Sequence, residues 1–141
     1  METIYRNRLP IQLRFNDIDV IGHVNNTMYF SFFDLGKTAY FEAVRGCHID
    51  WSNTDIVIRH IEADFMAPTF YKDQIEVDTA VVKLGNKSLQ MEQRIIDTKT
   101  NVVKCICRTV MVGFDPETNQ AKEISPCWKE AIRAYEKNPE L

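Results

Sequence analysis

Residues 14–41 read RFNDIDVIGHVNNTMYFSFFDLGKTAYF, and this stretch decides both the fold and the site. A strand-like alternation of apolar and polar residues over positions 11–15 stops at Asp17 and Asp19. A glycine turn with His23 and two asparagines follows, and a strongly apolar helix begins there. A helix start presents unpaired backbone N–H groups and a positive dipole end, which favour negative charge. A carboxylate beside it is the minimum equipment for acyl transfer or hydrolysis.

Length and composition predict one globular domain over residues 1–141. The chain has a formal net charge of −3, 45% hydrophobic residues and 26% charged residues, as in an ordinary water-soluble protein. This balance gives no general attraction to nucleic acid. No run approaches the roughly 20 apolar residues of a membrane span, and the N-terminus lacks the apolar core of a secretory signal. We therefore expect neither a nucleic acid nor a membrane as partner.

The cysteines indicate a reducing compartment. None of the four stands in a CxxC pair or with the spacing of metal ligands: Cys47, Cys105, Cys107 and Cys127. Cys105 and Cys107 are two apart in a strand-like run, so they share one face and make a poor disulfide. We expect all four to be reduced, mostly buried thiols in a cytoplasmic protein.

Periodicity predicts one long helix followed by four strands and a second helix. The helix over 26–45 carries apolar residues nearly all round, and Gly46 suits its C-terminal cap. The expected strands are 56–65, 75–82, 89–96 and 102–114, with turns at 84–87 and 97–101, and a final helix covers 126–137. One antiparallel sheet covers one side of a helix that is apolar on all sides. The remaining face predicts a second copy, as a homodimer or homotetramer.

This order, with NDIDVIGHVNNTMYFSFFD at residues 16–34, resembles the hotdog-fold acyl-CoA thioesterases of the 4-hydroxybenzoyl-CoA thioesterase type. The family pattern, D-x-D-x-x-G-[HI]-V and then an aromatic and an acidic residue, is met by Asp17, Asp19, Gly22, His23, Val24, Tyr29 and Asp34. The stretch 64–95 is also similar. The resemblance implies an α+β hotdog fold, with an antiparallel sheet wrapped around one long buried helix and a C-terminal helix.

The resemblance implies an acyl-CoA thioester hydrolase that needs no cofactor and no metal. It makes Asp19 the catalytic carboxylate, as nucleophile or as general base, and gives the polarising backbone N–H to Asn26 or a neighbour. It also places the acyl-CoA substrate between subunits. The alternative for Asp19 is simply to cap the turn, and Asp17 is expected to be structural, bonding turn amides or Arg14.

Other residues are weaker candidates. His23 is a candidate catalytic residue that would hydrogen-bond the carboxylate or touch the substrate; the alternative is that it only satisfies local backbone groups. A metal site of Asp17, Asp19 and His23 is disfavoured, because one short loop offers no second cluster of ligands. The predicted substrate contacts are Tyr29, Asp34, Arg59, His60, Lys87 and Ser88. A tyrosine at position 29 is more often a core residue than a substrate contact, and Asp34 in an apolar helix needs a partner and is expected to orient the turn.

Two other functions compete with hydrolysis. A hotdog dehydratase or hydratase needs an Asp and a His five apart in D-x-N-P-x-H, whereas His23 lies four residues after Asp19 and six after Asp17. A non-catalytic acyl-CoA-binding protein on the same fold is the second alternative.

Overall fold

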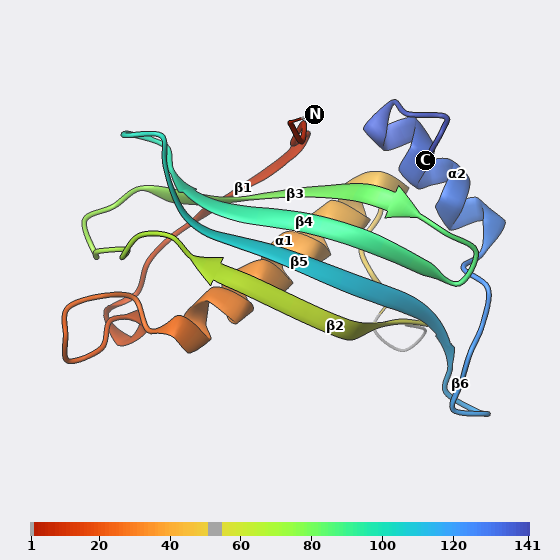
Figure 1. The fold of residues 1–141 in the computed structure, drawn as a ribbon, viewed down its shortest axis with the longest axis horizontal. Helices are drawn as coiled ribbons and strands as arrows, with labels where there is room; N and C mark the ends of the chain where they lie inside the picture. The colour runs from red at the N-terminus through yellow and green to blue at the C-terminus, as the bar shows by residue number, and fades with distance from the viewer. Residues whose placement is uncertain (1, 51–54) are drawn as a thin grey trace.

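The computed structural model describes residues 2–50 and 55–141, and its elements follow the predicted order (Figure 1). In chain order they are strand β1 (Asn7–Ile11), the 3₁₀ turn η1 (Phe15–Asp17), helix α1 (Asn26–Arg45), strands β2 (Ile56–Phe65), β3 (Ile75–Leu84), β4 (Ser88–Asp97), β5 (Val102–Asp115) and β6 (Gln120–Ala121), and helix α2 (Pro126–Glu136). The prediction of one long helix, four strands and a closing helix is confirmed.

The strands form one antiparallel sheet in the order β1-β3-β4-β5-β2, and the short β6 pairs with β5. Helix α1 crosses one face of this sheet, and α2 lies at the end where β3 passes into β4 (Figure 1). The ten-residue β2 and the five-residue β1 form the two edges. In the described ranges, no helix has the length and hydropathy that crossing a membrane requires.

Both ends of α1 follow from local sequence. The side chain of Asn25 accepts a hydrogen bond from the Thr27 N–H at 3.0 Å and caps the start. Gly46 ends the helix with a φ of +69°, a left-handed conformation that favours glycine. The last helix begins in the same way, because the Ser125 hydroxyl caps the Trp128 N–H at 3.3 Å and Pro126 follows at the first helical position.

Helix α1 buries one face against the sheet and leaves another open. The buried face carries Tyr29, Phe32, Phe33, Gly36, Lys37, Tyr40 and Phe41. On the open face, Phe30 is 37% exposed and Leu35 is 54% exposed. Burial on all sides is therefore not reached within one chain, because a single sheet covers a single face.

Gly36 brings α1 unusually close to the sheet. A Cβ at this position would lie 2.5 Å from Val77 Cγ1, 2.8 Å from Gln93 Nε2 and 3.0 Å from Thr79 Oγ1. Gln93, which is fully buried, donates to the Phe33 carbonyl at 2.9 Å and to the Thr79 hydroxyl at 3.0 Å. A glycine is required here because any side chain would collide with β3 and β4.

Two sequence predictions need correction. The strand-like run over 11–15 is wrong, because β1 ends at Ile11 and the chain turns into η1 with Phe15 85% exposed. The turn forms because the Asp17 carboxylate accepts the Arg14 backbone N–H. The cysteines are all free, as predicted, but two are buried and two, Cys47 and Cys127, are exposed.

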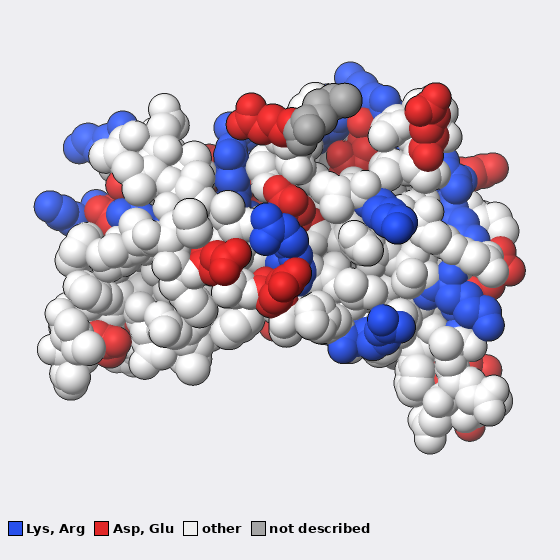
Figure 2. Space-filling view, in the orientation of Figure 1, with Lys and Arg blue, Asp and Glu red and all other residues white. Residues whose placement is uncertain are grey.

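Acidic and basic side chains lie next to one another near the centre of the outer face of the sheet (Figure 2). Asp78 is completely buried there and accepts Arg94 Nε at 2.8 Å, while Arg94 stacks on the Tyr5 ring. Neighbouring Glu76 lies 3.7 Å from Arg8 Nη1. Within the described residues, Glu76 Oε2 and Asp78 Oδ1 are buried without a hydrogen-bond partner. A proton held between the two carboxyls satisfies both oxygens, and this hydrogen bond, with burial, raises the pKa of Glu76 to about 7.

The raised pKa of Glu76 beside Asp78 predicts that the free energy of unfolding falls as pH rises from about 5 to 7. Folded Glu76 keeps its proton up to about pH 7, whereas the ordinary value is 4.5, so the folded state binds more protons in this window. Glu76→Gln, whose amide donates permanently to Asp78, is expected to remove that fall in the free energy of unfolding, measured by urea titration. Glu117→Gln, on an exposed turn, is the control. An unchanged pH slope in Glu76→Gln would contradict the shared proton.

Candidate active site

The acidic loop of residues 18–25 lies immediately before α1, with Asp19 half-buried in it. Asp19 Oδ1 accepts the Ile21 N–H at 2.9 Å, and the Asp19 backbone N–H donates to the His23 carbonyl at 2.9 Å. Ile18 and Val24 form a β-bridge that closes the loop. The described residues supply no partner for Asp19 Oδ2. One carboxylate oxygen therefore fixes the orientation of the group and the other stays available.

Asp17 has the structural role that the sequence predicted. It is fully buried, and its two carboxylate oxygens accept the Arg14 backbone N–H at 2.8 Å and Arg14 Nη2 at 3.0 Å. Its carbonyl accepts the Asn25 N–H at 2.9 Å. Asp17 thus ties the residues before the loop to the start of α1.

The segment 66–74, between β2 and β3, fastens the acidic loop. The Val24 N–H donates to the Thr69 carbonyl at 2.8 Å, and the Tyr29 hydroxyl donates to the buried Thr69 hydroxyl at 2.8 Å. Burial raises the pKa of Tyr29, so its phenol stays neutral. The His23 ring meets Phe70 edge to face at 5.0 Å and makes no side-chain hydrogen bond to Asp19. The loop is therefore held by contacts that the sequence motif alone does not reveal.

Lys104 of β5 holds this segment in turn. Its ammonium donates to the Pro68 carbonyl at 2.9 Å and lies 3.2 Å from Asp73, and both side chains are 9% exposed. Asp73 also accepts the Phe70 N–H at 2.8 Å. Sequence reasoning missed these positioning residues. The available signal was a lysine in the apolar run VVKCIC.

The first turn of α1, next to the loop, has one free backbone donor among the described residues. Thr27 N–H is used by the Asn25 cap, whereas the Asn26 N–H has no partner within the described residues. An unpaired amide at a helix N-terminus is suited to an oxyanion. A carboxylate, an oriented amide and the positive end of a twenty-residue helix thus share one location.

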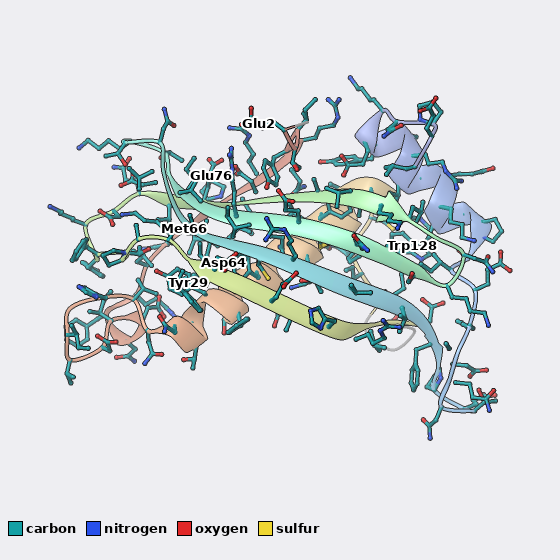
Figure 3. All side chains as sticks on the ribbon, viewed as in Figure 1. Glu2, Tyr29, Asp64, Met66, Glu76 and Trp128 are labelled. Atoms are coloured by element: carbon teal, nitrogen blue, oxygen red, sulfur yellow. The ribbon has the colours of Figure 1, made fainter. Side chains whose placement is uncertain are left out.

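Exposed apolar side chains surround this location. The exposed fractions are 85% for Phe15, 104% for Val20, 73% for Ile21, 61% for Met66 and 59% for Tyr71. The corresponding end of the molecule is largely uncharged on the side shown in Figure 2. Figure 3 places Tyr29 and Met66 at this end, far from Trp128 at the other. An apolar surround of this kind fits an acyl group or a second protein surface.

The other predicted substrate contacts lie elsewhere on the chain. Asp34 has a side chain 69% exposed and pairs with Lys37 at 3.5 Å, so it does not orient the acidic loop. Arg59 and His60 are exposed in the middle of the edge strand β2, beside a register irregularity. Lys87 and Ser88 lie at the turn between β3 and β4, at the opposite end of the sheet from Asp19 (Figure 1). One chain does not bring these groups together.

The described residues contain no group of three or more His, Cys, Asp or Glu side chains that would hold a metal ion. In particular, His23 faces Phe70 and Asp17 faces Arg14.

Solved structures share this architecture over nearly the whole chain. A thioesterase of Thermus thermophilus, solved with coenzyme A and zinc, is 27% identical, covers 96% of this chain and 97% of its own, and superposes with a TM-score of 0.85. A predicted thioesterase of Bacillus stearothermophilus is 25% identical over 94% of this chain and 97% of its own, with a TM-score of 0.83. A long helix on an antiparallel sheet, with the acidic loop at the helix start, makes this a hotdog-fold protein.

Sequence comparison gives the family. The family model described as the thioesterase-like superfamily matches residues 13–132, and the chain belongs to this superfamily. A curated relative, the acyl-CoA thioester hydrolase YbgC of Escherichia coli O6:H1, is 24% identical over 114 residues, which cover 77% of this chain and 82% of the relative. The predicted resemblance and the predicted fold are thus confirmed, and the chain is an enzyme of the thioesterase type.

The Thr69–Tyr29 contact yields a test of how the loop is held. Thr69→Val keeps the shape of the side chain but leaves the buried Tyr29 hydroxyl without its partner, which is expected to cost about 1–3 kcal/mol in free energy of unfolding. Adding Tyr29→Phe removes both polar groups, so the double variant is expected to recover most of this loss. Urea unfolding of the parent, the two single variants and the double variant measures this double-mutant cycle. A double variant that loses the sum of the two single losses would contradict the hydrogen bond.

Proposed function

We propose that this enzyme hydrolyses acyl-CoA thioesters to the free acid and CoA, with Asp19 as the reacting carboxylate. The main observation in support is the geometry of the loop. Oδ1 of Asp19 is fixed by the Ile21 N–H, while Oδ2 and the Asn26 N–H have no partners among the described residues. The family and the similarity to an acyl-CoA thioester hydrolase support the choice of substrate. The free cysteines favour a cytoplasmic location.

Two routes are open to this arrangement. In the first, Oδ2 attacks the thioester carbonyl, CoA thiolate leaves, and water hydrolyses the resulting mixed anhydride to regenerate Asp19. In the second, Asp19 takes a proton from water, whose oxygen attacks the carbonyl, and the proton leaves with the thiol. In both, the carbonyl oxygen becomes negative and accepts the Asn26 N–H at the positive end of α1. One such donor is worth on the order of 10²–10³ in rate.

A second copy completes the site in this proposal. The edge strand β2 has ten residues, exposes Val57, Ile58 and Ile61, and pairs only with β5 among the described residues. A long edge with unpaired backbone groups and exposed apolar side chains favours pairing with another strand. Antiparallel pairing of β2 with its own copy gives a homodimer with two-fold symmetry, and a tetramer would be a pair of such dimers.

In the proposed dimer, the end of β2 in one copy lies beside the start of β2 in the other. The N-terminal end of α1 lies by the end of β2, where Tyr29 contacts Phe65 at 5.5 Å. The C-terminal end of α1 lies by the start of β2, where Arg45 and Ile56 line one cavity. Rotation about the middle of β2 exchanges these ends and carries the partner's acidic loop toward the start of β2. Lys87 and Ser88 are at that same end and remain proposed CoA contacts of the partner's site, with Arg59 and His60 between the two sites.

The dimer proposal is tested by charge reversal. Pairing about the midpoint of β2 sets Arg59 against Glu62 of the partner subunit, twice per dimer. Glu62→Arg is expected to raise the dimer dissociation constant at least about ten-fold, because like charges then oppose one another across the strands. Adding Arg59→Glu restores the complementary pairs. Sedimentation velocity over a concentration series measures both. A Glu62→Arg protein that dissociates no more than the parent would contradict this pairing.

The proposed chemistry predicts that Asp19→Asn abolishes turnover. Asparagine keeps an oxygen for the Ile21 N–H but supplies neither a nucleophile nor a base, so a loss of at least about 10²-fold in kcat is expected with fold and oligomer unchanged. The assay is thiol release from short, medium, long and aromatic acyl-CoAs.

Asp115→Asn is a matched control, because Asp115 makes the same turn contact with the Glu117 N–H at 3.0 Å. If Asp19 only caps its turn, both variants keep activity and the proposal fails. Binding of acyl-CoA with no turnover by the parent protein would instead indicate an acyl-CoA-binding protein.

A further inference from the structure

A cavity in the described residues lies at the end of α1 opposite the acidic loop. It measures about 680 Å³ and is walled by the second half of α1, residues 47–50, the start of β2, Met111 and Trp128. Cavities of this size hold small-molecule ligands. Figure 3 shows Trp128 beside α2 at this end, far from Tyr29. Within one chain, nothing described above uses this space.

Lys37 in the wall of this cavity is buried without a hydrogen bond. The residue is 5% exposed, and its ammonium has no hydrogen-bond partner within the described residues. The nearest carboxylate, Asp34, lies 3.5 Å away and points largely into solvent. Burial lowers the pKa of Lys37. An ammonium held in this way carries a desolvation cost that an anionic partner would offset.

The other cations of the cavity already have partners. Arg45 stacks on Trp128 at 4.7 Å, and His48 Nδ1 lies 2.7 Å from Glu42. Of the acidic side chains in the wall, Asp55 pairs with Lys122 at 3.0 Å. Asp50 also lines the wall and already has an interaction partner. Lys37 therefore retains donors for a ligand.

The symmetry of the proposed dimer indicates which ligand reaches this cavity. Rotation about the middle of β2 carries the partner's acidic loop toward the start of β2, where this cavity lies. An acyl group bound at the partner's Asp19 then has the cavity ahead of it. Phe41, Ile56, Met111 and Trp128 offer apolar walls for methylene groups, and Lys37, whose ammonium has unused donors, lines the same cavity.

We propose that the cavity receives the far end of the acyl group hydrolysed at Asp19 of the partner subunit, and that Lys37 selects acyl groups with a terminal carboxylate. The inference rests on the proposed function, since it requires both Asp19 and the two-fold dimer. The carboxylate accepts hydrogen bonds from the Lys37 ammonium, and both charges leave water together in a pair. A plain alkyl end leaves the ammonium with only the exposed Asp34 carboxylate, 3.5 Å away.

The test compares acyl-CoAs of equal carbon number that differ in the terminal carboxylate: adipoyl- with hexanoyl-CoA and suberoyl- with octanoyl-CoA. The parent enzyme is expected to favour one of the dicarboxylic thioesters in kcat/KM. Lys37→Met keeps the length of the side chain and is expected to lower this preference by about ten- to a hundred-fold, the worth of a hydrogen bond to a charged group. Lys37→Arg is expected to keep a preference for the dicarboxylic substrate.

Lys99→Met, at the exposed turn between β4 and β5, is the control for the loss of one positive charge. A Lys37→Met enzyme with the parental preference would overturn the proposal. So would a Lys37→Met protein that dissociates into monomers, because the ammonium would then serve a carboxylate of the second copy.

Binding separates this inference from the proposed chemistry. In the Asp19→Asn background, calorimetry measures the affinity for adipoyl- and hexanoyl-CoA without turnover. Tighter binding of adipoyl-CoA that disappears on adding Lys37→Met supports the role of Lys37, even if Asp19 proves not to be the reacting group. Equal affinity for the two thioesters overturns the role of Lys37 and leaves the hydrolysis at Asp19 standing.

Discussion

The close approach of α1 to the sheet at Gly36 governs the rest of the molecule. With no side chain at this point, the helix backbone rests against Val77, Thr79 and Gln93. The amide of Gln93 then bonds the Phe33 carbonyl and locks the contact. The two ends of the helix are thereby fixed relative to the strands, and the free Asn26 amide at its start is held beside the acidic loop. A bulkier residue at position 36 would lift the helix and move both ends at once.

The acidic loop is held by one support that is close in sequence and by others that are remote. Asp17 ties the loop to the helix start through Arg14 and Asn25, while Thr69 ties it to the segment after β2. Lys104, from the far side of that segment, pairs with Asp73 where both are largely buried. A reacting carboxylate needs such support, because small displacements of a catalytic group lower the rate strongly.

Much of the fold could be predicted, because its signals are local. The bounds of α1 follow from a cap and a glycine, and the strands follow from alternation and turns. Asp19 and Asn26 were predicted from the family motif, and their roles stay predictions. Thr69 and Lys104 could not be found in this way, because their role comes from contacts between segments about 40 residues apart. The short η1 turn escaped because the Arg14–Asp17 contact overrides the alternation of residues 11–15.

The apolar excess of α1 joins the fold to the function. One sheet covers the face with Tyr29, Phe33 and Tyr40, and Phe30 and Leu35 stay open in a single chain. The edge strand β2 also lacks a partner strand on its outer side among the described residues. Both features are costly for an isolated molecule, and the proposed two-fold contact along β2 would cover the edge strand. Because the same contact would carry each acidic loop toward the cavity of the other copy, burial and substrate selection would have a single structural origin.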